Sequence, residues 1–332
     1  MKSFLLAGAL LCTAAVPALF AQVVVDTTRA DTLPSDTTDY TALVLKSQAD
    51  ARRLIPVPAR IGAGALLPAG ARLVVDRDSL LWHNAETVSD VLTKIPGVFL
   101  FRGGWAGRPE LPNFQARGAA SVEYELDGLP YVPMGQDSVM VDPSLLPVSF
   151  LDRIEIERLP GRLRVLMFTR RHDRSVPYSR IGIASGDLEI ARYQGILEKR
   201  STSGFGFATA FDHLSVPAQP SRLGDYRNTQ GWIRLDYIPT ERAGVVLQYL
   251  RNTPDREAVL GGGPPQDTLS RARHGARSDL SARFFLARGG PGGLGPRLDL
   301  LIGRTAWTDE IEKDSTRILT DSLGDNGEVV KT

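Results

Sequence analysis

The side chains that most often catalyse reactions or bind metal ions are scattered along this sequence. The four histidines lie at positions 83, 172, 213 and 274. None of them is four residues from another or next to the single cysteine, Cys12, although zinc ligands need such a spacing to converge on one ion. No Gly-x-Ser-x-Gly turn is present to carry a nucleophilic serine, and the run Asp321–Gly327 lacks the spacing of a calcium loop. The sequence therefore predicts a protein that is not an enzyme and needs no metal or cofactor.

Residues 1–21 have the pattern of a secretory signal peptide. Lys2 precedes an apolar run that begins at Phe4, and a small residue, Ala21, ends the segment. The apolar run is too short to cross the roughly 30 Å of hydrocarbon in a bilayer. We therefore expect residues 1–21 to direct export and to be removed afterwards.

The net charge and the hydropathy of the sequence limit which partners and which membrane-spanning elements can be expected. Lys plus Arg number 39 and Asp plus Glu number 38, and so even a balance gives no reason to expect nucleic acid as a partner. After residue 21 there is no apolar stretch of about 18 residues, which is the length that a membrane-spanning helix needs. Any membrane crossing would therefore have to be made by β-strands.

Residues 22–70 predict a mobile arm, because they are rich in Thr, Asp, Pro, Ala and Gly and show little periodicity. Two short segments in the arm have β-propensity, Val23–Thr27 and Thr41–Lys46. Each could add as an extra strand to the edge of a partner's sheet. The alternative is that the first segment only follows the cleavage site and that the second docks on the protein itself.

The segment from residue 71 to residue 172 predicts an α+β domain. A strand is expected at Arg72–Asp76, followed by a helical turn that opens at Asp78 or Ser79. The strongest helix has Asn84 as its N-cap and apolar residues at positions 88, 91, 92 and 95, until Pro96 stops it. Further strands are expected at Val98–Phe101, Asn113–Arg117, Val122–Leu126, Leu129–Val132 and Leu151–Leu159.

Four short motifs of this domain follow one another within about 70 residues. They are the helix end at Pro96-Gly97, the triplet Ala116-Arg117-Gly118, the turn Asp127-Gly128, and the strand that contains Arg153 and Glu155. In this order they resemble the plug domain of TonB-dependent outer-membrane receptors. The resemblance implies structural roles for Pro96, Gly97, Arg117, Gly118, Asp127, Gly128, Arg153 and Glu155. The chain departs from the family at Leu159–Arg162, where a longer loop is usual.

From residue 173 onward, segments of about ten residues alternate between apolar and polar positions. In Thr229–Ile238, for example, Ile233, Leu235 and Tyr237 lie on one face, and Arg234 lies on the other. Similar segments are Gly204–Phe211, Ala243–Asn252, Ser278–Arg288 and Arg297–Thr308. A tilted strand in lipid requires this alternation. A soluble β-sandwich also alternates, but the signal peptide and the resemblance upstream favour a barrel.

We therefore expect residues 173–332 to form the N-terminal portion of an antiparallel transmembrane β-barrel. Residues 217–227 and 261–276 read as its external loops. The segment has room for about seven or eight strands, whereas a barrel that encloses a plug has about 22. The sequence thus predicts an incomplete barrel.

The resemblance implies TonB-dependent transport of a scarce ligand through a plugged barrel in the outer membrane. The expected partners are TonB with its inner-membrane energising complex, outer-membrane lipid and a ligand that the sequence does not identify. The candidate contacts to TonB are Val23, Val24, Val25, Asp26 and Thr27. The candidate ligand-binding residues, in two loops of the plug, are Trp105, Arg108, Tyr131 and Gln136. Their alternative role is packing against the barrel wall, and the alternative function of the chain is a periplasmic interaction module without transport activity.

Overall fold

The computed structural model describes residues 44–46, 48–49, 55–58, 60–61, 70–102, 109–133, 140–186, 189–217, 225–260, 269–288 and 296–314. The chain separates into two units, Met1–Gln48 and Ala49–Thr332. In the first unit, residues 44–46 and 48 are helical, so the extended conformation expected for Thr41–Lys46 is wrong at its C-terminal end. The segment Val23–Thr27 lies outside the described residues.

The second unit contains a five-stranded mixed sheet, called the small sheet below. Its strands follow the order β1, β6, β7, β4 and β5. Their bounds are β1 Arg72–Asp76, β4 Val122–Leu126, β5 Leu129–Pro130, β6 Leu151–Leu159 and β7 Arg162–Thr169. Strand β4 runs parallel to β7, and the other neighbours are antiparallel. The strands predicted at Arg72–Asp76, Val122–Leu126 and Leu151–Leu159 are confirmed.

Helices α2 (Arg77–Trp82) and α3 (Val88–Leu92) begin at different residues from those predicted. Asp76 caps α2 by accepting a hydrogen bond from Ser79 N at 2.9 Å. Asn84 does not cap α3, because the helix begins at Val88 and Thr87 directly precedes it. Asn84 itself adopts a left-handed φ of 48°. Instead Asp90 accepts a hydrogen bond from Thr87 N at 3.0 Å, and this contact fixes Thr87 as the residue before the helix. The hydrogen bond between the Asp90 carboxylate and the Thr87 backbone therefore determines where α3 begins.

A separate two-stranded sheet, formed by β2 (Val98–Phe101) and β3 (Leu111–Phe114), follows the helices. The strand expected at Asn113–Arg117 ends early, because Gln115 and Ala116 adopt φ values of 51° and 58°. Such left-handed residues cannot continue a strand. Three single-turn 3₁₀ helices complete the domain: η1 (Ala119–Ser121), η2 (Pro143–Leu145) and η3 (Val148–Phe150).

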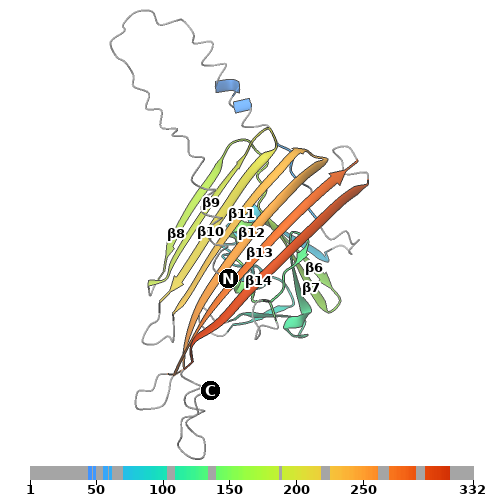
Figure 1. Ribbon diagram of the computed structural model, residues 1–332. Coiled ribbons are helices and arrows are strands. Elements are labelled where there is room, and N and C mark those ends of the chain that lie inside the picture. The colour runs from blue at the N-terminus through green and yellow to red at the C-terminus, as the bar shows by residue number, and fades with distance from the viewer. Residues whose placement is uncertain are drawn as a thin grey trace, which may run out of the picture. The chain divides into compact units, whose positions relative to one another are not determined.

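The rest of the second unit is a seven-stranded antiparallel sheet, called the large sheet below (Figure 1). Each strand pairs with its neighbours in sequence, and β8 and β14 are the two edges. The bounds are β8 Tyr178–Ser185, β9 Ala191–Arg200, β10 Phe205–Val216, β11 Tyr226–Thr240, β12 Ala243–Leu260, β13 Leu269–Ala287 and β14 Arg297–Asp314. Five of these strands contain the five alternating segments predicted from the sequence, except for Gly204 and Arg288, which lie just outside β10 and β13.

One expectation about the large sheet is wrong, because residues 261–276 are not all loop: β13 begins at Leu269. Strand pairing with β12 extends into a polar segment whose composition alone predicts a loop. Strands β8 and β9 are additional to the five segments named from the sequence.

The two faces of the large sheet differ in polarity, as the alternation predicted. On β11, Ile233, Leu235 and Tyr237 are 44%, 40% and 54% exposed. Trp232 and Arg234, at the alternate positions, are buried against the small-sheet side, where Trp232 stacks on Phe150 with ring centroids 6.3 Å apart. The face toward the small sheet is thus polar, and the opposite face is apolar.

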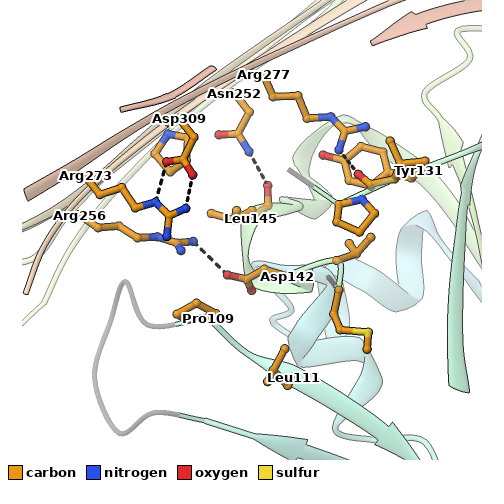
Figure 2. Close-up of a pocket in the computed structure, with 16 residues that line it drawn as sticks. Pro109, Leu111, Tyr131, Asp142, Leu145, Asn252, Arg256, Arg273, Arg277 and Asp309 are labelled. Atoms are coloured by element: carbon orange, nitrogen blue, oxygen red, sulfur yellow. Dashed lines mark hydrogen bonds and ion pairs between the residues drawn. The ribbon is translucent and has the colours of Figure 1, made fainter. Parts of the chain in front are cut away.

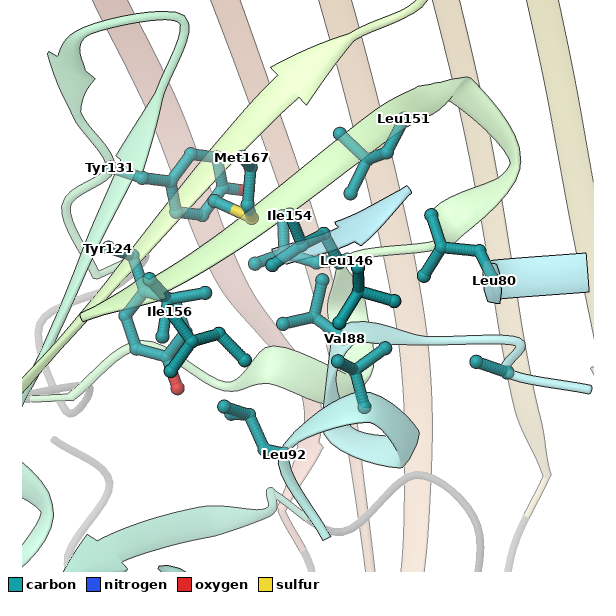
Figure 3. Close-up of a cluster of buried hydrophobic side chains, with 14 of the residues drawn as sticks. Leu80, Val88, Leu92, Tyr124, Tyr131, Leu146, Leu151, Ile154, Ile156 and Met167 are labelled. Atoms are coloured by element: carbon teal, nitrogen blue, oxygen red, sulfur yellow. The ribbon is translucent and has the colours of Figure 1, made fainter. Parts of the chain in front are cut away.

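The hydrophobic core lies where the helices, the small sheet and the large sheet meet (Figure 3). Leu80, Val88 and Leu92 from the helices pack with Ile154 and Ile156 of β6. Because these residues come from both ends of the domain's sequence, their burial packs the helices against the small sheet. None of the helices in the described part of the chain is long and apolar enough to cross a membrane.

Candidate functional site

A cavity of about 330 Å³ lies between loops of the small-sheet domain and the strands β12, β13 and β14 (Figure 2). The small-sheet domain contributes residues on either side of the segments 103–108 and 134–139. The large sheet contributes polar side chains from the face that is turned toward the small sheet. The lining residues are Pro109, Leu111, Tyr131, Val132, Pro133, Met140, Val141, Asp142, Leu145, Asn252, Pro254, Arg256, Arg273, Gly275, Arg277 and Asp309. This volume is at the lower end of the range for small-molecule sites.

Asp142 connects both loops and the large sheet. Its Oδ1 accepts hydrogen bonds from Ser144 N at 3.1 Å and from Glu110 N at 3.2 Å. Its Oδ2 accepts a hydrogen bond from Arg256 Nη2 at 3.0 Å, across the cavity from β12 (Figure 2). The carboxylate therefore caps η2 and holds the loop ends at 110 and 142 in a fixed position relative to β12.

Arg277 covers Tyr131 at the opposite end of the cavity. The guanidinium carbon lies 3.6 Å from the centroid of the Tyr131 ring, a cation–π contact. The same guanidinium donates to both carboxylate oxygens of Asp279, at 2.6 and 3.0 Å, and to Val132 O. Burial raises the pKa of Tyr131 to about 12, and the positive charge of Arg277 opposes this rise. Tyr131 is therefore a neutral, fixed wall of the cavity.

Arg256 and Arg273 lie directly opposite each other on β12 and β13. Two like charges at such positions destabilise a strand pair. Asp142 offsets one charge and Asp309 the other, since Arg273 Nε donates to Asp309 Oδ1 at 2.6 Å. The cavity wall thus places two guanidinium groups together and compensates them with carboxylates on either side (Figure 2).

The predicted ligand-binding residues have different outcomes. Tyr131 lines the cavity, and Trp105, Arg108 and Gln136 lie outside the described residues. The polar residues that the sequence analysis missed are Asp142, Asn252, Arg256, Arg273, Arg277 and Asp309. On β12 and β13 every second residue faces the plug domain, and this alternation could have identified the polar residues of these two strands. It was not used for β13, because residues 261–276 had been interpreted as a loop.

Several predicted structural residues occupy turns or connect strands. Gly97 and Gly128 have φ values of 85° and 87°, and a Cβ on Gly128 would lie 3.1 Å from Ile61. Asp127, with φ 49°, accepts hydrogen bonds from Thr169 Oγ1 at 2.6 Å and from Gln248 Nε2 at 2.8 Å. The hairpin turn is therefore also a link between the small sheet and β12.

The remaining motif residues have structural contacts as well. Gly118 has φ 82°, and Pro96 directly precedes the positive-φ Gly97. The guanidinium of Arg117 lies against the β6–β7 turn, 2.5 Å from where a Cβ of Gly161 would be. Arg153 pairs with Glu155 at 2.7 Å.

Two ion pairs, one of them buried, attach the small-sheet domain to the large sheet. Arg170, just after β7, donates to the two carboxylate oxygens of Glu198 on β9 at 2.7 and 2.9 Å. Arg192 on β9 donates to Asp212 on β10 and also reaches Glu86, near α3. Within the described ranges, no group of three or more His, Cys, Asp or Glu side chains is placed to hold a metal ion.

Comparison with known proteins agrees with this architecture. Residues 68–164 match the family model of the TonB-dependent receptor plug domain. The ferric yersiniabactin uptake receptor FyuA from Yersinia pestis superposes with a TM-score of 0.52 and 14% identity, over 74% of this chain and 42% of that receptor. The FrpB iron transporter (F3-3 variant) from Neisseria meningitidis gives a TM-score of 0.51 and 10% identity, over 66% of this chain and 38% of the transporter. No curated protein matches the chain in sequence.

The chain therefore contains a TonB-dependent receptor plug domain, followed by an antiparallel sheet that resembles part of the barrel of such receptors. At these identities the solved structures show the fold alone. The chain spans less than half the length of either structure.

Proposed function

We propose that the chain carries out TonB-dependent uptake of a scarce ligand across the outer membrane. The observation that carries this proposal is the large sheet, which is polar toward the plug domain and apolar on its other face. An exposed row of large apolar side chains is unfavourable in water and suits lipid, whereas the polar face finds partners on the plug. A soluble interaction module would need a partner protein to cover this face, whereas lipid covers it directly.

In this proposal, residues 1–21 are the signal peptide and residues 22–70 are the arm that meets TonB. Residues 71–172 are the plug, and residues 173–332 belong to the barrel. Extension of a TonB sheet by Val23–Thr27 would supply the mechanical link to the energised inner membrane.

The cavity around Asp142 faces the outside in this proposal. Strands β11 and β12 are joined by the two residues between Thr240 and Ala243, whereas the opposite ends of β10 and β12 lead into the longer connections to β11 and β13. Barrels of the outer membrane have short periplasmic turns and long external loops. Arg256 and Arg273 lie toward the long-loop end, so a ligand from outside would meet the cavity first. Trp105, Arg108 and Gln136 belong to the loops that border this cavity in sequence.

Crosslinking in cells tests the energised part of the proposal. A photoreactive residue at Val24 or Val25 should form an adduct with TonB in the outer-membrane fraction. The same residue at Ser47 serves as a control within the arm. The proposal is wrong if neither Val24 nor Val25 yields a TonB adduct while the chain is present in the envelope.

A further inference from the structure

The outer face of the large sheet, which is turned away from the small sheet, changes from apolar to polar at one level on three neighbouring strands. The apolar positions on this face are Val245, Leu247 and Tyr249 on β12, Leu286, Phe284, Ala282 and Leu280 on β13, and Leu298, Leu300 and Ile302 on β14. The next outward residues are Arg251, Ser278 and Arg304. They are neighbours, because Arg251 pairs with Ser278 and Arg304 pairs with Leu280, two residues from Ser278.

The level of these residues agrees with the edge of the apolar band of a barrel. Arg251 lies nine residues after Arg242, which is in the short turn between β11 and β12. Nine residues of a strand that is tilted by about 45° rise roughly 20 Å along the membrane normal, close to the height of the band, which is about 25 Å. An arginine on the lipid side is costly in the middle of this band but not at its edge. Arg251 therefore lies at the level of the lipid headgroups, toward the long-loop end of the sheet.

Arg251, Ser278 and Arg304, called the outer-face cluster below, offer hydrogen-bond donors. Ser278 Oγ accepts hydrogen bonds from Tyr249 Oη at 3.2 Å and from Arg251 Nη1 at 3.4 Å. Because these bonds occupy both lone pairs, the Ser278 hydroxyl has its proton to offer to a further group. Arg251 and Arg304 are exposed, and within the described ranges neither guanidinium pairs with a carboxylate. Two guanidinium groups and one hydroxyl proton suit the oxygens of a phosphate.

We propose that the outer-face cluster binds the phosphomonoester of an anionic lipid in the leaflet at the long-loop end. Arg251 and Arg304 donate to two of the phosphate oxygens, and Ser278 donates to the third. A phosphomonoester carries a charge of about −1.5 to −2 at pH 7, which balances two guanidinium groups better than the single charge of a diester does. The proposal rests on the proposed function, since it needs the outer face to lie in lipid.

The occupant is a lipid because the apolar band begins directly beside the cluster. Tyr249 and Leu280 are 37% and 53% exposed and lie one outward position from Arg251 and Ser278. Acyl chains attached to the bound phosphate would cover these side chains and remove their apolar surface from water. Free phosphate offers no such contact.

Native mass spectrometry of the full chain in detergent measures the lipid preference. The probes are dioleoyl phosphatidic acid, which is a phosphomonoester, and dioleoyl phosphatidylglycerol, which is a phosphodiester with the same acyl chains. The apparent Kd for phosphatidic acid should be about tenfold lower or more, since one further charge-assisted hydrogen bond is worth about this much. An excess of inorganic phosphate should not displace phosphatidic acid, because it lacks the acyl chains.

Variants assign the preference to the cluster. R251Q and R304Q should each reduce it, the double variant should remove it, and S278A should reduce it in part. R227Q is the matched control, because Arg227 is also exposed on the outer face but its Nη2 lies 3.8 Å from Asp225 Oδ2. R227Q should bind both lipids like the unmodified chain.

Equal affinities for the two lipids in the unmodified chain would overturn the proposal, and this result does not need any variant to fold. A loss in R227Q as large as in R304Q would overturn it in favour of a response to surface charge in general. Displacement by inorganic phosphate would overturn it in favour of a site for free phosphate. A chain without lipid preference that still crosslinks to TonB in the outer membrane would refute only the lipid site and leave the proposed function standing.

Discussion

The ion pair between Arg170 and Glu198 should control how firmly the plug is attached to the large sheet. The two side chains are 5% and 1% exposed and share two charge-assisted hydrogen bonds. Replacing Glu198 by Gln leaves the buried guanidinium of Arg170 without its compensating charge. Removing one partner of a buried pair costs about 3–5 kcal/mol, because the other charge stays desolvated. A free energy of about 1.4 kcal/mol corresponds to a tenfold change in an equilibrium constant. The fraction of molecules in which β7 is detached from the large sheet should therefore rise about a hundredfold or more.

Hydrogen exchange measures this opening directly. The amides of β7, which lead into Arg170, should lose protection in Glu198→Gln by an amount that corresponds to this free energy. Glu123→Gln is the matched control, because its pair with Arg162 is 2.9 Å long but has side chains that are 42% and 60% exposed. An exposed pair contributes only about 0–1 kcal/mol.

The double variant Arg170→Met/Glu198→Leu separates the charge effect from packing. It should recover most of the lost protection, because an apolar pair of similar volume removes both buried charges. Unchanged protection in Glu198→Gln, or a double variant as unprotected as the single one, would refute the reasoning.

Three other changes have defined outcomes. Gly128→Val should destabilise the chain by about 1–3 kcal/mol in thermal melts, because of its positive φ and the nearby Ile61, whereas Gly195→Ala, with open space around its Cα, should change little. Burial raises the pKa of Glu110, so its contribution to stability is complete at low pH and is lost as the pH rises through that pKa. Glu110→Gln should therefore gain stability relative to the unmodified chain as the pH rises from below the usual glutamate pKa to above the raised one, and a difference that is constant with pH would contradict this. Alanine at Trp105 and Arg108 should lower uptake without lowering the amount of protein in the outer membrane, and unchanged uptake would place the ligand elsewhere.

The elements that sequence predicted well are those fixed by local chemistry. The turn at Asp127-Gly128 needs two positive φ values, and the structure has them. The alternation on β11 also predicts the correct face for Arg234 and Leu235, because burial reverses at every residue of a strand.

The misses originate in contacts that general sequence patterns do not specify. Asn84 satisfies the general rule for an N-cap, but the contact between Asp90 and Thr87 sets the helix start. Arg273 belongs to a polar segment that only pairing with β12 makes into a strand. The role of Asn252 in the cavity depends on Leu145, 107 residues away, and no local pattern contains that distance.

The exposure of β11 to lipid tests the central claim most directly. Trp232 and Ile233 are adjacent but face opposite sides of the large sheet, with 1% and 44% exposure. Two chains with a single tryptophan are needed, and in both of them Trp82, Trp105 and Trp307 are replaced by Phe. The first chain keeps Trp232. The second chain carries Trp232→Phe and Ile233→Trp. In outer-membrane lipid with brominated acyl chains, fluorescence of the tryptophan at position 233 should be strongly quenched, and that of Trp232 should be nearly unchanged. Equal quenching at the two positions, or none at position 233, would contradict the assignment of the large sheet to the membrane.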